Sequence, residues 1–165
     1  MVDAIMVGSR TVILDDPLLT TREYPGRSPQ RVIYDPNGRL TRNFKVFNDD
    51  GNKVYYFSHG ENKDLTGGHI LKYQLAVQKP ELDQIFSALF AGRIGILLVE
   101  GGAHVHDLFV QQNAWDEAWV IRTSHPLNEG IEAPNIRGKL IDEIELGTDR
   151  IVGIRNEVKH QNPIL

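Results

Sequence analysis

The chain has 165 residues, no cysteine and a formal net charge of −4. A chain of this length buries roughly 70% of its unfolded surface, so we expect one domain with its own core. The acidic balance without a basic stripe argues against nucleic acid as the main partner. The lack of cysteine excludes disulfides and thiolate metal sites, and no apolar run is long enough to span a membrane, so we expect a cytoplasmic protein.

The first predicted element is a short apolar segment, residues 4–7, which favours a buried strand that ends at Gly8. The Ser9 side chain can cap a helix N-terminus, so the sequence predicts a short helix through residues 10–14. Pro17 ends this helix, because the residue before a proline avoids the helical conformation.

Polar residues of this helix and the segment after it are candidates for ligand contacts. Thr11 and Asp15 are four residues apart, so on a helical turn they would share a face. Asp15 and Asp16 could bind a metal ion, but neighbouring carboxylates before a proline are more often a cap and a solvated turn. Residues 18–22 are expected to be extended, and Arg22 is either an ordinary surface charge or a phosphate anchor.

Four segments rich in β-branched and aromatic residues predict further strands, separated by turns that contain Gly, Pro or Asn. They are residues 30–34, 44–47, 53–57 and 69–73. The sequence from Asp35 to Gly38 has the residues preferred in a type I turn.

The best-defined helix is predicted to begin at Pro80 and to end at Gly92. Between them, apolar residues recur at the spacing of one helix face. These are Leu82, Ile85, Phe86, Leu89 and Phe90.

Residues 94–99 form an apolar run without alternation, which predicts a parallel strand buried on both faces. Glu100 follows at the carboxyl end, where open α/β sheets bind ligands, and Gly101 and Gly102 come next. Glycines let a ligand approach the backbone, and free N–H groups at the start of a helix expected from Ala103 to about Asn113 favour a phosphate. Two glycines after a strand are also common in simple tight turns. Together these features predict a pocket for a phosphorylated ligand.

The remainder of the chain is predicted to add a strand at residues 117–121, an irregular loop at 127–138 and an antiparallel hairpin of residues 141–146 and 151–158. The alternation of strands and helices up to residue 121 predicts a parallel sheet with right-handed crossovers. His104 and His106 would point in different directions on a helix, so they are not expected to form a metal-ligand pair. The chain contains no Walker A, G-x-G-x-x-G or G-x-S-x-G motif.

Two stretches closely resemble the reductase domain of the bifunctional riboflavin-biosynthesis deaminase–reductase. Residues 3–22 contain T-V-x-x-D-D-P-x-L-x-x-R, and residues 98–103 read L-V-E-G-G-A, followed at a suitable distance by W-D-E at 115–117. The resemblance implies a dihydrofolate-reductase-like α/β fold, with a mostly parallel central sheet, flanking helices and a C-terminal antiparallel hairpin. Residues 1–165 would form a single reductase domain.

The same resemblance implies NADPH-dependent reduction of 5-amino-6-(5-phosphoribosylamino)uracil, with hydride transfer to C1′ of the sugar. It implies that NADPH is contacted by Thr11, Asp15, Gly102, Ala103, His104, Val105, His106, Asp107 and Leu108. It implies that the phosphorylated pyrimidine substrate is contacted by Leu19, Arg22 and Glu100. It assigns no catalytic acid and no metal. From its position, we expect Arg10 to meet the 2′-phosphate of NADPH.

The chain departs from the family pattern in three respects. The deaminase half is missing, since its zinc motif requires cysteine. The family's reductase domain normally has a strand and a helix before residue 3, so we expect an N-terminally truncated and catalytically impaired domain. Pro36 stands where the family often has a hydroxyl residue. The family also implies a homodimer and, in a full-length protein, a deaminase domain.

Two other functions are compatible with these features. One is a related dihydrofolate-reductase-like oxidoreductase that acts on another substrate. The other is a non-catalytic domain that binds a nucleotide.

Overall fold

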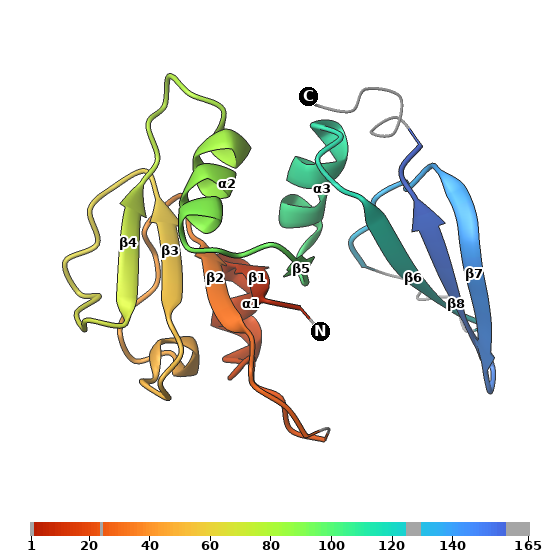
Figure 1. Ribbon diagram of the computed structural model, residues 1–165, viewed down its shortest axis with the longest axis horizontal. Helices are drawn as coiled ribbons and strands as arrows, with labels where there is room; N and C mark the ends of the chain where they lie inside the picture. The colour runs from red at the N-terminus through yellow and green to blue at the C-terminus, as the bar shows by residue number, and fades with distance from the viewer. Residues whose placement is uncertain (1, 24, 125–129, 158–165) are drawn as a thin grey trace. The chain divides into compact units, whose positions relative to one another are not determined.

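The computed structural model describes residues 2–23, 25–124 and 130–157 (Figure 1). The chain divides into two compact units, Met1–Val105 and His106–Leu165. Within the described residues, no helix has both the length and the apolar character needed to cross a membrane.

The first unit contains an all-parallel sheet of five strands in the order β4-β3-β2-β1-β5. Its strands are β1 (Ala4–Gly8), β2 (Gln30–Tyr34), β3 (Val54–Ser58), β4 (Ile70–Gln74) and β5 (Leu97–Val99). Apolar residues on both faces of β1 to β3 are buried, as a parallel sheet covered on both sides requires. The predicted parallel sheet is therefore confirmed.

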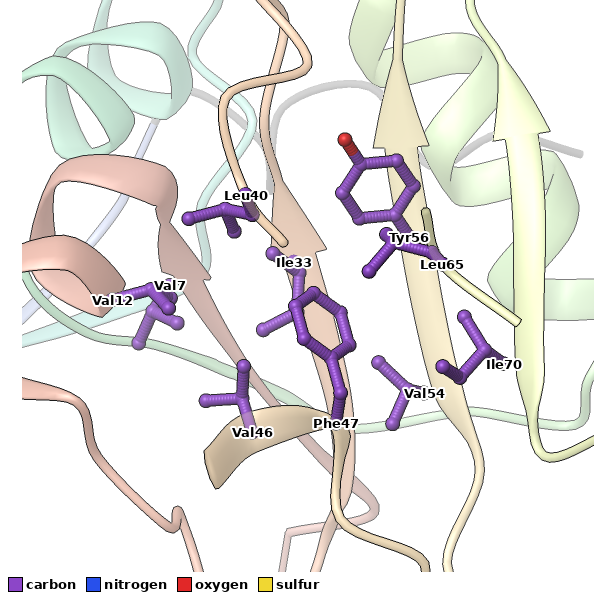
Figure 2. Packing of buried hydrophobic residues seen from close by; sticks show 10 residues of the cluster. All are labelled: Val7, Val12, Ile33, Leu40, Val46, Phe47, Val54, Tyr56, Leu65 and Ile70. Atoms are coloured by element: carbon purple, nitrogen blue, oxygen red, sulfur yellow. The ribbon is translucent and has the colours of Figure 1, made fainter. Parts of the chain in front are cut away.

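One face of this sheet is covered by α1 (Ser9–Asp15), by the short 3-10 helix η1 (Lys45–Phe47) and by adjoining loops. Figure 2 shows the buried cluster that these segments form with the strands. Its members are Val7, Val12, Ile33, Leu40, Val46, Phe47, Val54, Tyr56, Leu65 and Ile70.

The strand predicted at residues 44–47 is wrong, because this segment forms η1. Val46 and Phe47 are adjacent and pack in the same buried cluster, whereas successive side chains of a strand point to opposite faces. The guanidinium of the buried Arg31 donates hydrogen bonds to the carbonyls of Val46 and Asn48, both at 3.0 Å. These bonds replace part of the pairing that a strand would supply.

The helix α2 (Glu81–Ala91) begins directly after Pro80, as predicted. Leu82, Ile85 and Leu89 are buried, whereas Phe86 and Phe90 of the predicted apolar stripe are 38% and 84% exposed. Gly92 has an ordinary right-handed conformation. A Cβ on Gly92 would collide with the Tyr55 hydroxyl, so close packing explains the glycine. The left-handed residue after the helix is Arg93 (φ 61°).

The second unit contains an antiparallel sheet in the order β6-β8-β7. Its strands are β6 (Glu117–Thr123), β7 (Lys139–Leu146) and β8 (Asp149–Arg155), so the predicted hairpin is confirmed. The prediction that the strand from residue 117 extends the parallel sheet is wrong, since β6 pairs antiparallel with β8. The described part of the predicted loop, residues 130–138, is irregular. Residues 127–129 and Val158 lie outside the described residues.

Asp3 fixes the approach to β5. Its Oδ2 accepts hydrogen bonds from the N–H groups of Gly95 and Ile96, both at 2.8 Å. The backbone donors of Ile96 and then Gly95 lower the pKa of the Asp3 carboxyl below its ordinary value of 3.8. The ionised carboxylate therefore stabilises the fold above that value, and the stabilisation is lost as the pH falls through the lowered pKa.

We expect Asp3→Ala to lower Tm at neutral pH and the difference from the wild type to disappear in strong acid. Asp3→Asn, which keeps an oxygen acceptor without the charge, is expected to lose less. Thermal unfolding across this pH range measures both effects. A gap in Tm between wild type and Asp3→Ala that stays constant with pH would contradict the role of the carboxylate.

Candidate functional site

The carboxyl ends of the five parallel strands lie at one edge of the sheet, where α/β proteins of this kind bind ligands. At this edge β1 leads through Gly8 into α1, and β2 leads into the turn that begins at Asp35. On the other side of β1, β5 leads through Glu100 and the glycine pair into α3 (Ala103–Gln111). The residues of the first unit that are predicted to bind ligands follow two of these strands, β1 and β5.

β5 is shorter and more exposed than the sequence predicts. It spans Leu97–Val99 at the edge of the sheet, and Ile96 and Leu98 are 55% and 40% exposed. The expectation of burial on both faces is therefore wrong, because β1 alone among the described strands pairs with this one. The N–H of Glu100 donates to the Met6 carbonyl at 2.8 Å, which continues the pairing to the glycine turn. The Glu100 residue is exposed.

The glycine pair forms a left-handed turn that packs directly on α1. Gly101 and Gly102 have φ values of 73° and 59°, a region that favours glycine. A Cβ on Gly101 would lie 2.7 Å from Thr11 Oγ1, and one on Gly102 would lie 3.5 Å from it. The fold thus brings Thr11 to a turn that is 90 positions away in the sequence. This contact joins the two stretches that carry the family resemblance.

The starts of α1 and α3 are also closely packed. A Cβ on Gly8 would lie 2.8 Å from Val105 Cγ2, and Val105 is buried. The Val105 N–H donates to the Gly102 carbonyl at 3.1 Å, so its amide is already engaged within the turn. Ala103 and His104, which come between them, are half-buried and exposed respectively.

Ser9 does not act as the helix cap that the sequence predicts. The N-cap of α1 is Gly8, which makes no side-chain capping bond, and Ser9 is the first helical residue. The buried Ser9 Oγ instead accepts a hydrogen bond from Arg39 Nη2 at 3.0 Å. This places a guanidinium beside the first turn of α1.

The two aspartates at the end of α1 have different environments. Asp15 is exposed as the last helical residue, on the same face as Thr11. Asp16 is left-handed (φ 40°), accepts a hydrogen bond from the Lys45 N–H at 2.8 Å and pairs with Lys45 Nζ at 3.2 Å. The Lys45 N–H lowers the pKa of the Asp16 carboxyl. Asp16 therefore anchors η1. Neither aspartate belongs to a metal site, since the described residues contain no group of three or more His, Asp or Glu that could hold a metal ion.

His104 belongs to a polar network that the sequence pattern did not indicate. Its ring stacks on Tyr34, with centroids 6.2 Å apart and planes at 27°. The Tyr34 hydroxyl donates to Glu81 Oε2, and Glu81 Oε1 lies 2.6 Å from His59 Nε2. Burial, reinforced by the Glu81 carboxylate, raises the pKa of Tyr34 well above its usual value. Tyr34, Glu81 and His59 come from three separate elements, so no spacing in the sequence reveals the network.

The two residues predicted to contact substrate after α1 lie in the connection to β2. Leu19 has a left-handed φ of 54°, so the extended conformation predicted for residues 18–22 is wrong at this position. Its side chain packs partly buried against the cluster of Figure 2. Arg22 is exposed, and among the described residues no hydrogen bond or ion pair engages its guanidinium. It is therefore available to an anion.

The predicted cofactor contacts of α3 continue beyond the first unit. His106, Asp107 and Leu108 are half-buried residues of the helix within the second unit. Their roles stay predictions, as do those of the residues in the first unit. What the first unit provides by itself is a turn without Cβ atoms, the Thr11 side chain beneath it and a helix start after it. That donor set fits the phosphates of a dinucleotide.

Comparison with known proteins supports the family resemblance that the two sequence motifs indicate. The sequence model of the family described as the RibD C-terminal domain matches residues 1–145. A protein of Methanothermobacter thermautotrophicus, 2,5-diamino-6-ribosylamino-4(3H)-pyrimidinone 5′-phosphate reductase, is 30% identical over 168 residues, which covers 91% of this chain and 78% of that protein. The riboflavin biosynthesis protein RibD of Aquifex aeolicus is 29% identical and is matched over 85% of this chain and 40% of its own length.

Among solved structures, a diaminohydroxyphosphoribosylaminopyrimidine deaminase/5-amino-6-(5-phosphoribosylamino)uracil reductase from Thermotoga maritima superposes with a TM-score of 0.80 at 26% identity. The match covers 94% of this chain and 45% of that one, so the chain spans less than half of the bifunctional relatives. The predicted fold class and the predicted family resemblance are both confirmed.

Proposed function

The chain belongs to the RibD C-terminal domain family, whose relatives include reductases of riboflavin biosynthesis, and we propose that it uses NADPH to reduce 5-amino-6-(5-phosphoribosylamino)uracil to its ribitylamino product. The observation that carries this proposal is the packing of Thr11 against the Gly101–Gly102 turn. It unites the two family motifs in one phosphate-accepting structure at the carboxyl edge of the sheet.

The cofactor would be held at this edge by backbone and side-chain donors. The N–H groups of Gly102, Ala103 and His104 are suited to its phosphates, and the Thr11 hydroxyl supports the same turn. Asp15 lies one helical turn after Thr11 and can accept hydrogen bonds from hydroxyls or an amide. In this proposal Val105, His106, Asp107 and Leu108 complete the cofactor contacts along α3. A reduced nicotinamide, when bound, supplies a hydride.

The substrate would be oriented by the remaining predicted residues. The Arg22 guanidinium offers a planar fork to the 5′-phosphate, and its exposure and lack of a described partner suit that role. The Glu100 carboxylate can accept hydrogen bonds from ribose hydroxyls or from uracil N–H groups. Leu19 would provide an apolar contact beside the Arg22 segment.

The reaction adds a hydride to C1′ of the ribosylamino group and breaks the bond from C1′ to the ring oxygen. The ring oxygen takes up a proton and becomes the C4′ hydroxyl of the open ribityl chain. The proposal assigns no residue as the proton donor. The contribution of the protein is to align the sugar with the cofactor.

Further features belong to the same proposal. The family match spans the first unit and most of the second, so we propose that both units form one reductase domain. We also propose that the protein is cytoplasmic and dimeric, and that a full-length form carries a deaminase domain, as the length of the RibD relatives favours.

A second substrate has specific support. The relative from Methanothermobacter thermautotrophicus, which this chain covers to 78%, is named for a 2,5-diamino-6-ribosylamino-pyrimidinone phosphate. That compound retains the amino group that the uracil substrate lacks. NADPH oxidation measured in parallel with both compounds discriminates the two. We expect turnover of the uracil compound, and turnover of the diamino compound alone would transfer the assignment to the reaction for which that relative is named.

Binding of NADPH without turnover of either compound would favour a nucleotide-binding domain without catalysis. Because the chain covers only part of its relatives, the assay is to be repeated with a protein that has the full length of those relatives. Catalysis by the longer protein alone would support the reductase assignment.

A further inference from the structure

We propose that Arg39 binds the 2′-phosphate of the adenosine ribose and so makes the cofactor site selective for NADPH over NADH. The inference rests on the proposed function and names the residue that decides between the two cofactors. In this role Arg39 replaces Arg10, which we expected from the sequence to meet the 2′-phosphate.

Arg39 lies at the same carboxyl edge of the sheet as the proposed phosphate site, after β2. It follows the turn after β2, in which the Gly38 N–H donates to the Asp35 carbonyl at 3.0 Å. Its Nη2 donates to the buried Ser9 Oγ at 3.0 Å. Ser9 precedes Thr11 by two residues, a rise of about 3 Å along the helix. The guanidinium is therefore held at the first turn of α1 through Ser9, whereas Gly101 packs on Thr11, whose side chain points in a different direction. A dinucleotide that lies across α1 can contact both, with its pyrophosphate at the glycine turn and its adenosine ribose at Arg39.

The end of β2 is the place where related sheets distinguish the two cofactors. In doubly wound folds an acid after this type of strand binds the free ribose hydroxyl of NADH, whereas an arginine accommodates the phosphate of NADPH. Here the acid is Asp35, which is fully buried. Its Oδ2 accepts hydrogen bonds from the Leu40 N–H at 2.9 Å and from the Tyr56 hydroxyl at 2.8 Å. It is therefore turned into the core and cannot receive a ribose hydroxyl.

Arg39 has the free donors that a phosphate requires. The residue is exposed, and within the described part of the chain no carboxylate pairs with it. A guanidinium has five N–H donors, and the bond to Ser9 uses one of them. Its remaining donors can grip a phosphate through a planar fork. Arg10 is also exposed, but no described contact fixes its side chain.

The test compares ligands that differ only in the 2′-phosphate. Calorimetry would measure the binding of NADPH and NADH to the wild type, to Arg39→Ala and to Arg10→Ala. Adenosine 2′,5′-bisphosphate and adenosine 5′-monophosphate form a second matched pair. We expect Arg39→Ala to weaken NADPH and the bisphosphate by about 10- to 100-fold, the effect of losing charge-assisted hydrogen bonds, and to leave NADH and the monophosphate unchanged.

Two further variants separate charge from position. Arg39→Lys keeps the charge without the fork and is expected to recover part of the preference. Ser9→Ala removes the anchor and is expected to weaken NADPH by less than Arg39→Ala does. Thermal unfolding of each variant establishes that it is folded.

The outcomes separate this inference from the proposed function. Loss of the preference in Arg10→Ala but not in Arg39→Ala would overturn the inference and restore Arg10. Equal affinity of the wild type for both members of each pair would overturn it as well, while leaving a dinucleotide site in place. Failure of all four ligands to bind would refute the cofactor site itself.

Discussion

Gly101→Ala is expected to weaken NADPH binding by about 10- to 100-fold. A left-handed conformation costs a residue with a side chain about 1–2 kcal/mol. The new Cβ would also meet Thr11, with Oγ1 at 2.7 Å and Cγ2 at 3.0 Å. The Thr11 side chain is short and has no flexible end that could move aside, so the turn or α1 must shift. The N–H groups would then be misdirected from the phosphates.

Two other glycines provide matched controls for this variant. Gly147 has a φ of 63°, and a Cβ added to it would meet nothing within 4 Å, so Gly147→Ala introduces similar backbone strain without a collision. We expect it to lower the free energy of unfolding by about 1–2 kcal/mol and to leave NADPH affinity unchanged. Gly102→Ala, with Thr11 Oγ1 at 3.5 Å, is expected to have an intermediate effect on affinity.

Calorimetry measures the cofactor affinities, and urea unfolding measures the stabilities. Equal NADPH affinities in Gly101→Ala and Gly147→Ala would show that the glycine turn does not hold the cofactor. In that case the packing of Thr11 on the turn would have only a structural role.

Arg22→Ala is expected to weaken substrate binding by about 10- to 100-fold while changing NADPH affinity by less than about twofold. A hydrogen bond to a charged group contributes about 1.5–3 kcal/mol, and a phosphate gripped by a guanidinium fork forms such bonds. Arg22 is exposed and makes no described intramolecular bond, so its removal is not expected to destabilise the fold. The measurement is KM or Kd for the phosphorylated substrate alongside Kd for NADPH.

Arg27→Ala is the control for Arg22→Ala. Arg27 is an exposed arginine of the same connection, so the variant removes one charge from the same segment. We expect it to leave substrate affinity nearly unchanged. Equal losses of substrate and cofactor in Arg22→Ala, or equal substrate losses in both variants, would contradict a phosphate anchor at position 22.

The sequence was sufficient for features that depend on neighbouring residues. Pro80 marked the start of α2, and the Asp35–Gly38 turn forms with its expected hydrogen bond. The hairpin of β7 and β8 was predictable because its strands are adjacent and joined by a short turn at Gly147. The family itself could be identified from two short motifs, since they contain the residues that a ligand site constrains.

Predictions failed where pairing or packing with distant residues decides the structure. Residues 44–47 have the composition of a strand but form a 3-10 helix, where the buried Arg31 from β2 donates to the carbonyls of Val46 and Asn48. The strand after α3 has no local feature that distinguishes parallel from antiparallel pairing, and its partner β8 lies more than 25 residues further along the chain. Ser9 is a good capping residue by type, yet its hydroxyl is taken by Arg39.

By itself, the sequence determined the strand and helix segments around the site, the glycine pair and the family, because local conformation and motif chemistry reside in consecutive residues. Only the tertiary structure placed Thr11 against Gly101, turned Asp35 into the core and brought Arg39 to Ser9. These contacts join residues from different strands and loops, and their geometry is set by the order of strands in the sheet. No spacing along the chain encodes that order directly.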